Sequence, residues 1–132
     1  MQIVDDFKPY IKDIIELENT YLTKTLKSLD ANDKVIVAID DNKLLGYLYY
    51  SLVIDEAEII SICVNPLYRR RGIASKMLSY LISKGVNLCY LDVKENNIPA
   101  ISLYQSFGFL EYLRRSNYYS DNSNAILMKW SR

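Results

Sequence analysis

Three β-rich runs that follow one another along the chain constrain its fold most strongly. They cover residues 35–39, 44–54 and 57–64, and they are joined only by Asp40-Asp41-Asn42 and Asp55-Glu56. Short polar connections between β-rich runs are typical of hairpins. The pattern therefore predicts three consecutive strands in an antiparallel meander.

Helical spacing of apolar residues appears on both sides of this meander. Residues 10–29 predict one amphipathic helix, or two short helices broken near residues 20–23. After the meander, residues 73–82 predict a helix that starts after Gly72 and ends before Gly85. Helices are thus expected before and after the three strands.

The remaining segments complete the order α-βββ-α-β-α-ββ. A strand is predicted at 88–93, a helix at 98–106, and two strands at 109–115 and 125–130 with the polar loop 116–124 between them. The helix at 73–82 connects two strands, and such a crossover makes the strands parallel. We expect an α/β (α+β) fold with a mixed, mostly antiparallel sheet and helices on both faces.

Length and composition predict one domain over residues 1–132. Hydrophobic residues make up 50% of the chain and charged residues 24%, which suits a packed core. Because 16 Lys and Arg balance 16 Asp and Glu, no overall positive field favours nucleic acid or a membrane surface as a partner. No apolar run approaches the roughly 20 residues of a membrane span, and the acidic N-terminus lacks a signal-peptide pattern. We expect a cytoplasmic protein.

The absence of histidine limits the chemistry that the chain can perform. No imidazole can act as a base, and the only two cysteines, Cys63 and Cys89, lie in separate strand-like runs, so no metal site is expected. Both thiols are interpreted as small buried hydrophobes. Acid–base chemistry therefore falls to carboxylates, tyrosines or lysines.

The segment Asn65-Pro66-Leu67-Tyr68-Arg69-Arg70-Arg71-Gly72-Ile73-Ala74 is the sharpest local motif. It connects a predicted strand to a predicted helix, where free backbone N–H groups and the helix dipole favour anions. The motif lacks the glycine pattern of a Walker A loop or a dinucleotide fingerprint. Taken alone, it is either a solvated basic turn or a pyrophosphate site.

Two blocks of the sequence resemble the GNAT acetyltransferases. Arg69-Arg70-Arg71-Gly72-Ile73-Ala74 is similar to the Arg/Gln-x-x-Gly-x-Gly/Ala pyrophosphate loop of that superfamily. Residues 91–109 are similar to its later block, with Asn, Ala, Leu-Tyr and Gly-Phe in the same order and spacing. The resemblance implies the GNAT fold and acetyl-CoA as cosubstrate, with no metal.

The C-terminal part resembles the ribosomal-protein-alanine N-acetyltransferase subfamily. The similar segments are Arg114-Arg115-Ser116-Asn117-Tyr118-Tyr119 and Ala125-Ile126-Leu127-Met128. The resemblance extends over residues 57–132 and fades before them, where an aromatic Phe-Pro-Trp element of the subfamily is missing. Asn124 stands where these relatives carry an acidic residue.

The resemblance also implies a set of cofactor contacts. Backbone groups of a strand are expected to bind the pantetheine arm, and amides at the start of a helix are expected to bind the pyrophosphate. Asn97 is expected to bond the cofactor arm, and Tyr104 is expected near its sulfur. The backbone contacts are assigned to Ile62, Cys63 and Val64 for pantetheine, and to Arg70, Arg71, Gly72, Ile73, Ala74 and Ser75 for pyrophosphate.

Catalytic roles follow from the same resemblance. Asp92 matches the base position, where close relatives carry glutamate, and Glu58 is the competing carboxylate. Tyr104 is the expected acid or hydrogen-bond donor for the departing thiolate, although its helical spacing with other apolar residues also suits core packing. Glu58 is also expected to contact the acceptor. Apart from the resemblance, Tyr118 and Tyr119 are either two further strand aromatics or a tyrosine pair in a polar loop that stacks on or hydrogen-bonds a peptide acceptor.

The function predicted from the sequence is direct acetyl transfer from acetyl-CoA to a primary amine. A protein or peptide N-terminus, such as that of a ribosomal protein, is the favoured acceptor, because an α-amine with a pKa of about 7.7 to 8.0 deprotonates more readily than a lysine near 10.4. The alternatives are lysine, a polyamine or another small amine as acceptor, or an acetyl-CoA-binding sensor module with little catalysis.

Overall fold

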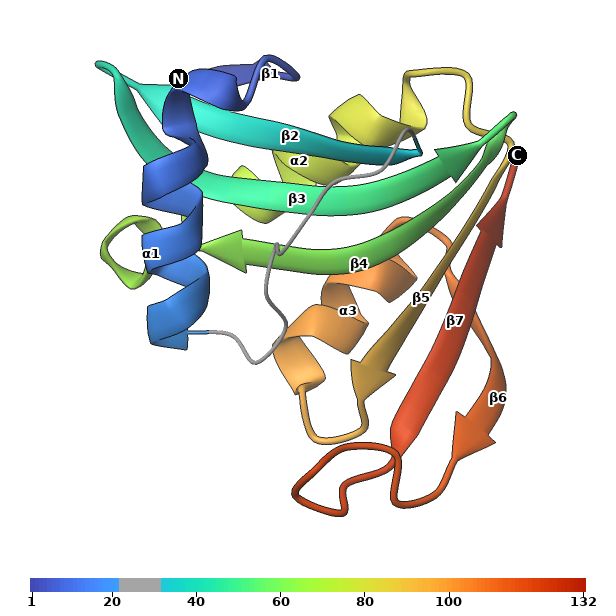
Figure 1. Ribbon diagram of the computed structural model, residues 1–132. Coiled ribbons are helices and arrows are strands. Elements are labelled where there is room, and N and C mark those ends of the chain that lie inside the picture. Colours follow the sequence, from blue (N-terminus) through green and yellow to red (C-terminus); the bar gives the residue numbers. More distant parts are fainter. Residues whose placement is uncertain (22–31) are drawn as a thin grey trace.

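The computed structural model describes residues 1–21 and 32–132, which form one seven-stranded sheet flanked by helices (Figure 1). The strand order across the sheet is β1-β2-β3-β4-β5-β7-β6. The helices are α1 (Ile11–Tyr21), α2 (Ile73–Ile82) and α3 (Ile98–Ser106), with short 3₁₀ helices η1 (Lys8–Tyr10) and η2 (Pro66–Tyr68). The strands are β1 (Gln2–Val4), β2 (Asp33–Asp40), β3 (Lys43–Val53), β4 (Glu56–Val64), β5 (Leu88–Lys94), β6 (Leu110–Arg115) and β7 (Ala125–Ser131).

The element order predicted from the sequence is confirmed, and one strand is added to it. β1 pairs antiparallel with β2, from Gln2 opposite Ile39 to Val4 opposite Val37. Three residues are too few to show an alternating pattern, so no sequence signal predicts this strand. Of the helix predicted at 10–29, α1 covers residues 11–21, and residues 22–31 lie outside the described part.

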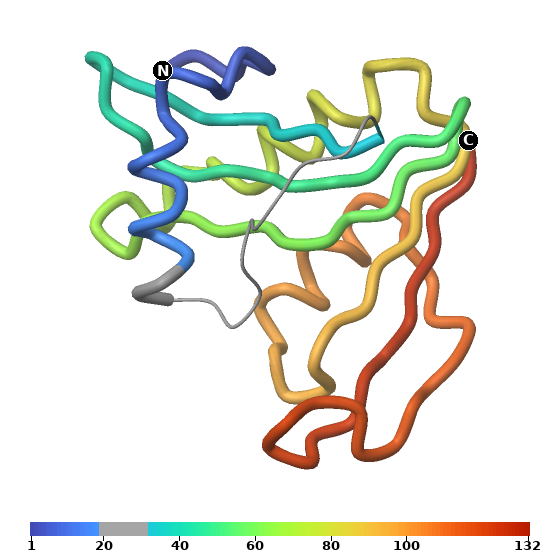
Figure 2. Tube along the Cα trace, in the orientation of Figure 1, coloured from blue at the N-terminus to red at the C-terminus, as the bar shows by residue number. Residues whose placement is uncertain are grey.

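The sheet opens between β4 and β5. These strands pair in parallel, as the crossover predicted, but only where Glu56, Ala57 and Glu58 lie opposite residues 88–90. Beyond this point they diverge, which Figure 2 shows as two traces running apart. A register shift between Tyr49 and Tyr50 leaves Ile60 as an extra residue in β4, and such a bulge bends a strand. The opening exposes one edge of β4.

Helices cover both faces of the sheet, as predicted (Figure 1). α2 and α3 lie on one face, where Met77, Leu78 and Leu81 of α2 are fully buried in the larger core cluster. α1 lies on the other face and packs Ile14 and Leu17 into a smaller cluster. In the part of the chain described, no helix is long and apolar enough to cross a membrane.

Gly46 lets β3 and β4 approach closely near the opening. A Cβ atom at this position would lie 2.6 Å from the carbonyl oxygen of Cys63. The contact involves backbone, which cannot yield as a flexible side chain can, so the position tolerates only glycine. The close approach fixes β3 against the end of β4 that borders the opening.

Candidate active site

A cleft of about 440 Å³ lies next to the opening between β4 and β5. Its walls come from the end of β4, the loop that leads into α2, and α3. The residues that line it are Ile62, Val64, Tyr68, Arg69, Arg70, Gly72, Ile73, Ala74, Ser75, Pro99, Ala100, Leu103 and Tyr104. Most of the residues that the sequence assigned to the cofactor are therefore brought together around one cavity.

Alternation along β4 separates the predicted cofactor residues by face. Ile62 and Val64 pack against the cluster on the α2 and α3 side, whereas Cys63 belongs to the cluster under α1. The Cys63 side chain therefore points away from the cleft. Burial raises the pKa of this thiol to about 11, so it stays protonated at neutral pH. Cys63 and Cys89 are both buried, as the sequence predicted.

The loop before α2 presents an open helix terminus to the cleft. Gly72 is the N-cap residue with φ +71°, and no side chain among the described residues caps this end of α2. Arg70 also has a positive φ, 65°, so two of three consecutive residues adopt the left-handed conformation. A Cβ atom on Gly72 would meet nothing within 4 Å. Uncapped N–H groups with open space before them form an anion-binding terminus.

Arg71 does not line the cleft. Its guanidinium lies over the ring of Tyr68, 5.4 Å from the centroid. Tyr68 in turn lines the cleft from η2. The contact therefore holds the charge of Arg71 beside the helix terminus.

Asn97 and Tyr104 occupy opposite ends of α3. Asn97 is the N-cap residue, and its Oδ1 accepts a hydrogen bond from the backbone N–H of Ala100 at 3.3 Å. It does not line the cleft. Tyr104 does line it, is 4% exposed, and packs its ring 5.6 Å from that of Phe109. Burial, with smaller effects from Cys89 and Asp92, raises the pKa of Tyr104, so its hydroxyl keeps its proton.

A second cavity, of about 330 Å³, brings the two candidate carboxylates together. Asp92 and Tyr90 alternate along β5 with Leu91 and Val93, and the latter two pack into the core under α2 and α3. The residues that line the cavity are Glu58, Tyr90, Leu91, Asp92, Tyr112, Arg115, Tyr118 and Leu127. Acidic and aromatic groups together suit an amine.

The two neighbouring tyrosines of the β6–β7 connection have different surroundings. Tyr118 is exposed and lines the second cavity. Tyr119 does not line it, and its hydroxyl donates a hydrogen bond to Oδ2 of Asp92 at 3.2 Å. Burial and the negative charge of Asp92 raise the pKa of Tyr119. The sequence had assigned both residues to the acceptor, without distinguishing them.

Comparison with known proteins identifies the family of this chain. The sequence model of the Acetyltransferase (GNAT) family matches residues 2–109. The chain belongs to this family.

Two proteins that are similar to this GNAT chain are named ribosomal-protein-alanine N-acetyltransferases. A ribosomal protein bS18-alanine N-acetyltransferase of Salmonella typhimurium is 36% identical over 95 residues, which are 67% of this chain and 64% of the relative. The alignment thus spans less than two thirds of that relative. The crystal structure of the ribosomal-protein-S18-alanine N-acetyltransferase from Escherichia coli superposes with a TM-score of 0.88 at 26% identity, covering 98% of this chain and 92% of that one.

A second solved structure agrees in fold. A GNAT family acetyltransferase from Elizabethkingia anophelis, solved with acetyl-CoA bound, has a TM-score of 0.76 at 19% identity and covers 99% of this chain and 97% of its own. The GNAT fold expected from the sequence is therefore confirmed by both structures.

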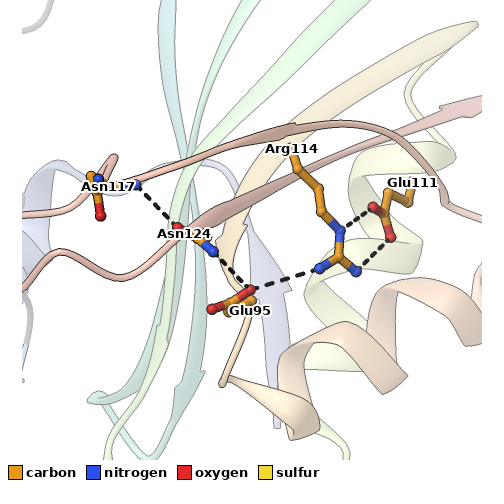
Figure 3. A network of polar contacts seen from close by, with 5 residues as sticks. All are labelled: Glu95, Glu111, Arg114, Asn117 and Asn124. Atoms are coloured by element: carbon orange, nitrogen blue, oxygen red, sulfur yellow. Dashed lines mark hydrogen bonds and ion pairs between the residues drawn. The ribbon is translucent and has the colours of Figure 1, made fainter.

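A polar network ties the β6–β7 connection of this GNAT chain to the end of β5 (Figure 3). Glu95 accepts a hydrogen bond from Nδ2 of Asn124 at 3.3 Å and lies 3.7 Å from Nη1 of Arg114. Arg114 also donates to Glu111 at 2.6 Å. The backbone N–H of Asn117 donates to Oδ1 of Asn124 at 3.0 Å. Both ends of the connection are thereby fastened beside the turn that leads to α3.

Sequence reasoning missed several residues of the second cavity. Tyr90 lies two positions before Asp92, so strand alternation alone places both on one face. Tyr112 and Arg115 lie on β6, whose six residues are all exposed and show no alternation of burial. Only the strand pairing revealed their position. In the described residues, no group of three or more side chains could hold a metal ion.

Proposed function

We propose that this GNAT protein transfers the acetyl group of acetyl-CoA directly to a primary amine, and that the acceptor is a protein N-terminal α-amine. One observation carries the proposal. A single cleft runs from the uncapped start of α2 to the hydroxyl-bearing Tyr104, and the negative charge of Asp92, which lines the second cavity, contributes to the raised pKa of Tyr104. Sites for an anionic cofactor and for an amine are adjacent.

The cofactor would occupy the 440 Å³ cleft. Backbone groups of Ile62, Cys63 and Val64 lie on the edge of β4 that β5 leaves unpaired, and they would bind the pantetheine arm as an added strand. Amides from Arg70 to Ser75 would bind the pyrophosphate at the start of α2. The side-chain amide of Asn97 would donate to the cofactor arm, since its Oδ1 already accepts from Ala100.

The chemistry needs one proton acceptor and one proton donor. The neutral amine attacks the thioester carbonyl carbon, and the C–S bond breaks with its electron pair on sulfur. Asp92, directly or through a water molecule, takes the proton that the amine nitrogen loses. Tyr104 donates to the leaving thiolate, and its raised pKa ensures that the donor proton is present. One proton thus leaves the amine nitrogen, and one proton reaches the sulfur of CoA.

The acceptor assignment rests on the relatives and on the second cavity. Proteins named ribosomal protein bS18-alanine N-acetyltransferase are similar to this chain, so the N-terminus of a ribosomal protein is the first acceptor to consider. Glu58 and Asp92 would attract the amine, and Tyr118 would contact the peptide. An α-amine is also partly neutral near pH 7, unlike a lysine side chain.

Release of CoA from acetyl-CoA tests the proposal. Short peptides with free N-terminal alanine or serine are compared with N-terminally blocked lysine peptides and with spermidine. We expect turnover on the free α-amines. Turnover only on lysine or spermidine would identify that amine as the acceptor instead. CoA binding without turnover on any amine would favour a sensor module.

A further inference from the structure

The hydrogen bond between Tyr119 and Asp92 joins the β6–β7 connection to the candidate base. Tyr118 and Tyr119 are adjacent in sequence, yet their rings are perpendicular, with centroids 5.1 Å apart. Only the first of the two lines the cavity that contains Asp92. The second approaches the carboxylate with its hydroxyl, 3.2 Å from Oδ2. Tyr118 therefore contacts the cavity, whereas Tyr119 contacts the candidate base.

Residues next to Asp92 hold the Tyr119 ring in this position. The ammonium of Lys94 lies 5.3 Å from the ring centroid and 3.1 Å from Oδ2 of Asp121. Asp121 also accepts hydrogen bonds from the backbone N–H and the hydroxyl of Ser123, and these bonds lower its pKa. Because Lys94 is two residues from Asp92 on β5, the same strand positions both the candidate base Asp92 and the ring of Tyr119.

The groups that face Asp92 come from several neighbouring elements. The Tyr119 hydroxyl reaches it from the β6–β7 connection, and the negative charge of Asp92 contributes to the raised pKa of Tyr104 on α3. In the cavity the other groups are Glu58 of β4, Tyr90 of β5, Tyr112 and Arg115 of β6, and Tyr118. A neutral hydrogen-bond donor can hold a carboxylate in one orientation. Tyr119 is such a donor, because its raised pKa keeps it protonated.

We propose that Tyr119 is a positioning residue for acetyl transfer, which orients the Asp92 carboxylate that takes the proton of the acceptor amine. This inference rests on the proposed function. It assigns different roles to two neighbouring tyrosines. Tyr118 contacts the acceptor, whereas Tyr119 acts through Asp92.

Steady-state kinetics of matched variants test this division. Tyr119→Phe removes only the hydroxyl, and we expect kcat to fall roughly tenfold with unchanged CoA affinity. Tyr118→Phe makes the same change one residue away, at the residue proposed to contact the acceptor, and we expect it to act mainly through a higher acceptor KM. In an Asp92→Asn background, Tyr119→Phe should have little further effect, since both changes remove the same interaction. An equal loss in the two backgrounds, or no loss of kcat, would overturn the proposal.

A measurement without turnover separates this inference from the proposed function. The titration of Tyr119 can be followed by NMR with ¹³Cζ-labelled tyrosine, assigned with the Tyr119→Phe variant. Asp92→Asn should lower the pKa of Tyr119, because the negative charge is lost, although burial still holds it above its ordinary value. Glu58→Gln, the matched control that also removes one carboxylate charge, should have a smaller effect. Absence of turnover in the wild-type protein would reject the proposed function, whereas a Tyr119 titration insensitive to Asp92 would reject the positioning role.

Discussion

Asn124 donates a hydrogen bond from its side-chain Nδ2 to the Glu95 carboxylate at 3.3 Å. Its Oδ1 simultaneously accepts from the backbone N–H of Asn117 at 3.0 Å. An aspartate could accept the second bond but could not donate the first. The departure from the acidic residue expected by resemblance at this position therefore has a structural reason, namely the carboxylate of Glu95.

Asn124→Asp should loosen the β6–β7 connection. The variant loses the donor and places a second negative charge beside Glu95, so the free energy of unfolding should fall by about 1 kcal/mol. The acceptor KM should rise several-fold while CoA affinity is unchanged, because the connection carries Tyr118 and lies away from the start of α2. Urea unfolding and steady-state kinetics measure both effects.

The double variant Glu95→Gln with Asn124→Asp provides the control. It exchanges donor and acceptor, so a glutamine can donate to the new aspartate and restore part of the stability. An Asn124→Asp protein as stable as the wild type would show that the Asn124–Glu95 bond contributes little.

Alanine substitutions at the two glycines that flank α2 separate the effect of backbone strain on stability from the effect on cofactor binding. Gly72 and Gly85 both have positive φ, +71° and +79°, and an added Cβ atom would meet nothing within 4 Å at either position. Alanine at either position should therefore lower stability by a similar amount, about 1 to 2 kcal/mol. Only Gly72 borders the cleft, so Gly72→Ala alone should also weaken CoA binding, by about tenfold.

Calorimetric titration with CoA and thermal unfolding of both variants test this comparison. Equal CoA affinity in Gly72→Ala and Gly85→Ala would place the pyrophosphate elsewhere.

The sequence predicted the elements because their signals are local. Hairpin connections such as residues 40–42, and the switch from strand to helix around Gly72, depend only on neighbouring residues. The same locality explains why the sequence alone predicts a helix that starts directly after Gly72. β1 was missed because its three residues become a strand only by pairing with β2.

The contacts around the proposed acceptor site join residues that are far apart in the sequence, so no local pattern predicts them. Asp92 and Tyr119 are 27 residues apart, and Asn124 and Glu95 are 29 apart. Neither pair leaves a periodic pattern, because each arises from the pairing of β5 with β7 and the path of the connection after β6. The family resemblance identified the residue types of this region but not which of them touch.

Both cysteines should be unreactive in the folded protein at pH 8. Burial raises the pKa of Cys63 to about 11 and that of Cys89 to about 12, and the thiolate is the reactive form. Relative to a thiol with the ordinary pKa of 9.0, the thiolate fraction of Cys63 falls about a hundredfold. A chromogenic disulfide reagent should therefore modify two thiols in denaturant and react slowly without it. Rapid reaction of the native protein that is lost in Cys63→Ser would contradict the burial of this residue under α1.

Tyr104→Phe tests the proposed donor to the CoA thiolate. The ring should keep its packing against Phe109, 5.6 Å away, so fold and CoA affinity should be retained. Turnover should fall about a hundredfold, the scale of a lost proton donor. Because burial raises the pKa of Tyr104, wild-type kcat should show no decline from loss of its proton below about pH 10. Tyr50→Phe is the matched control, since Tyr50 is a phenol in the same core cluster, 3% exposed, and does not line the cleft. Equal losses of CoA affinity and turnover in Tyr104→Phe would mean that the phenol serves binding, whereas unchanged turnover would mean that it only packs the core.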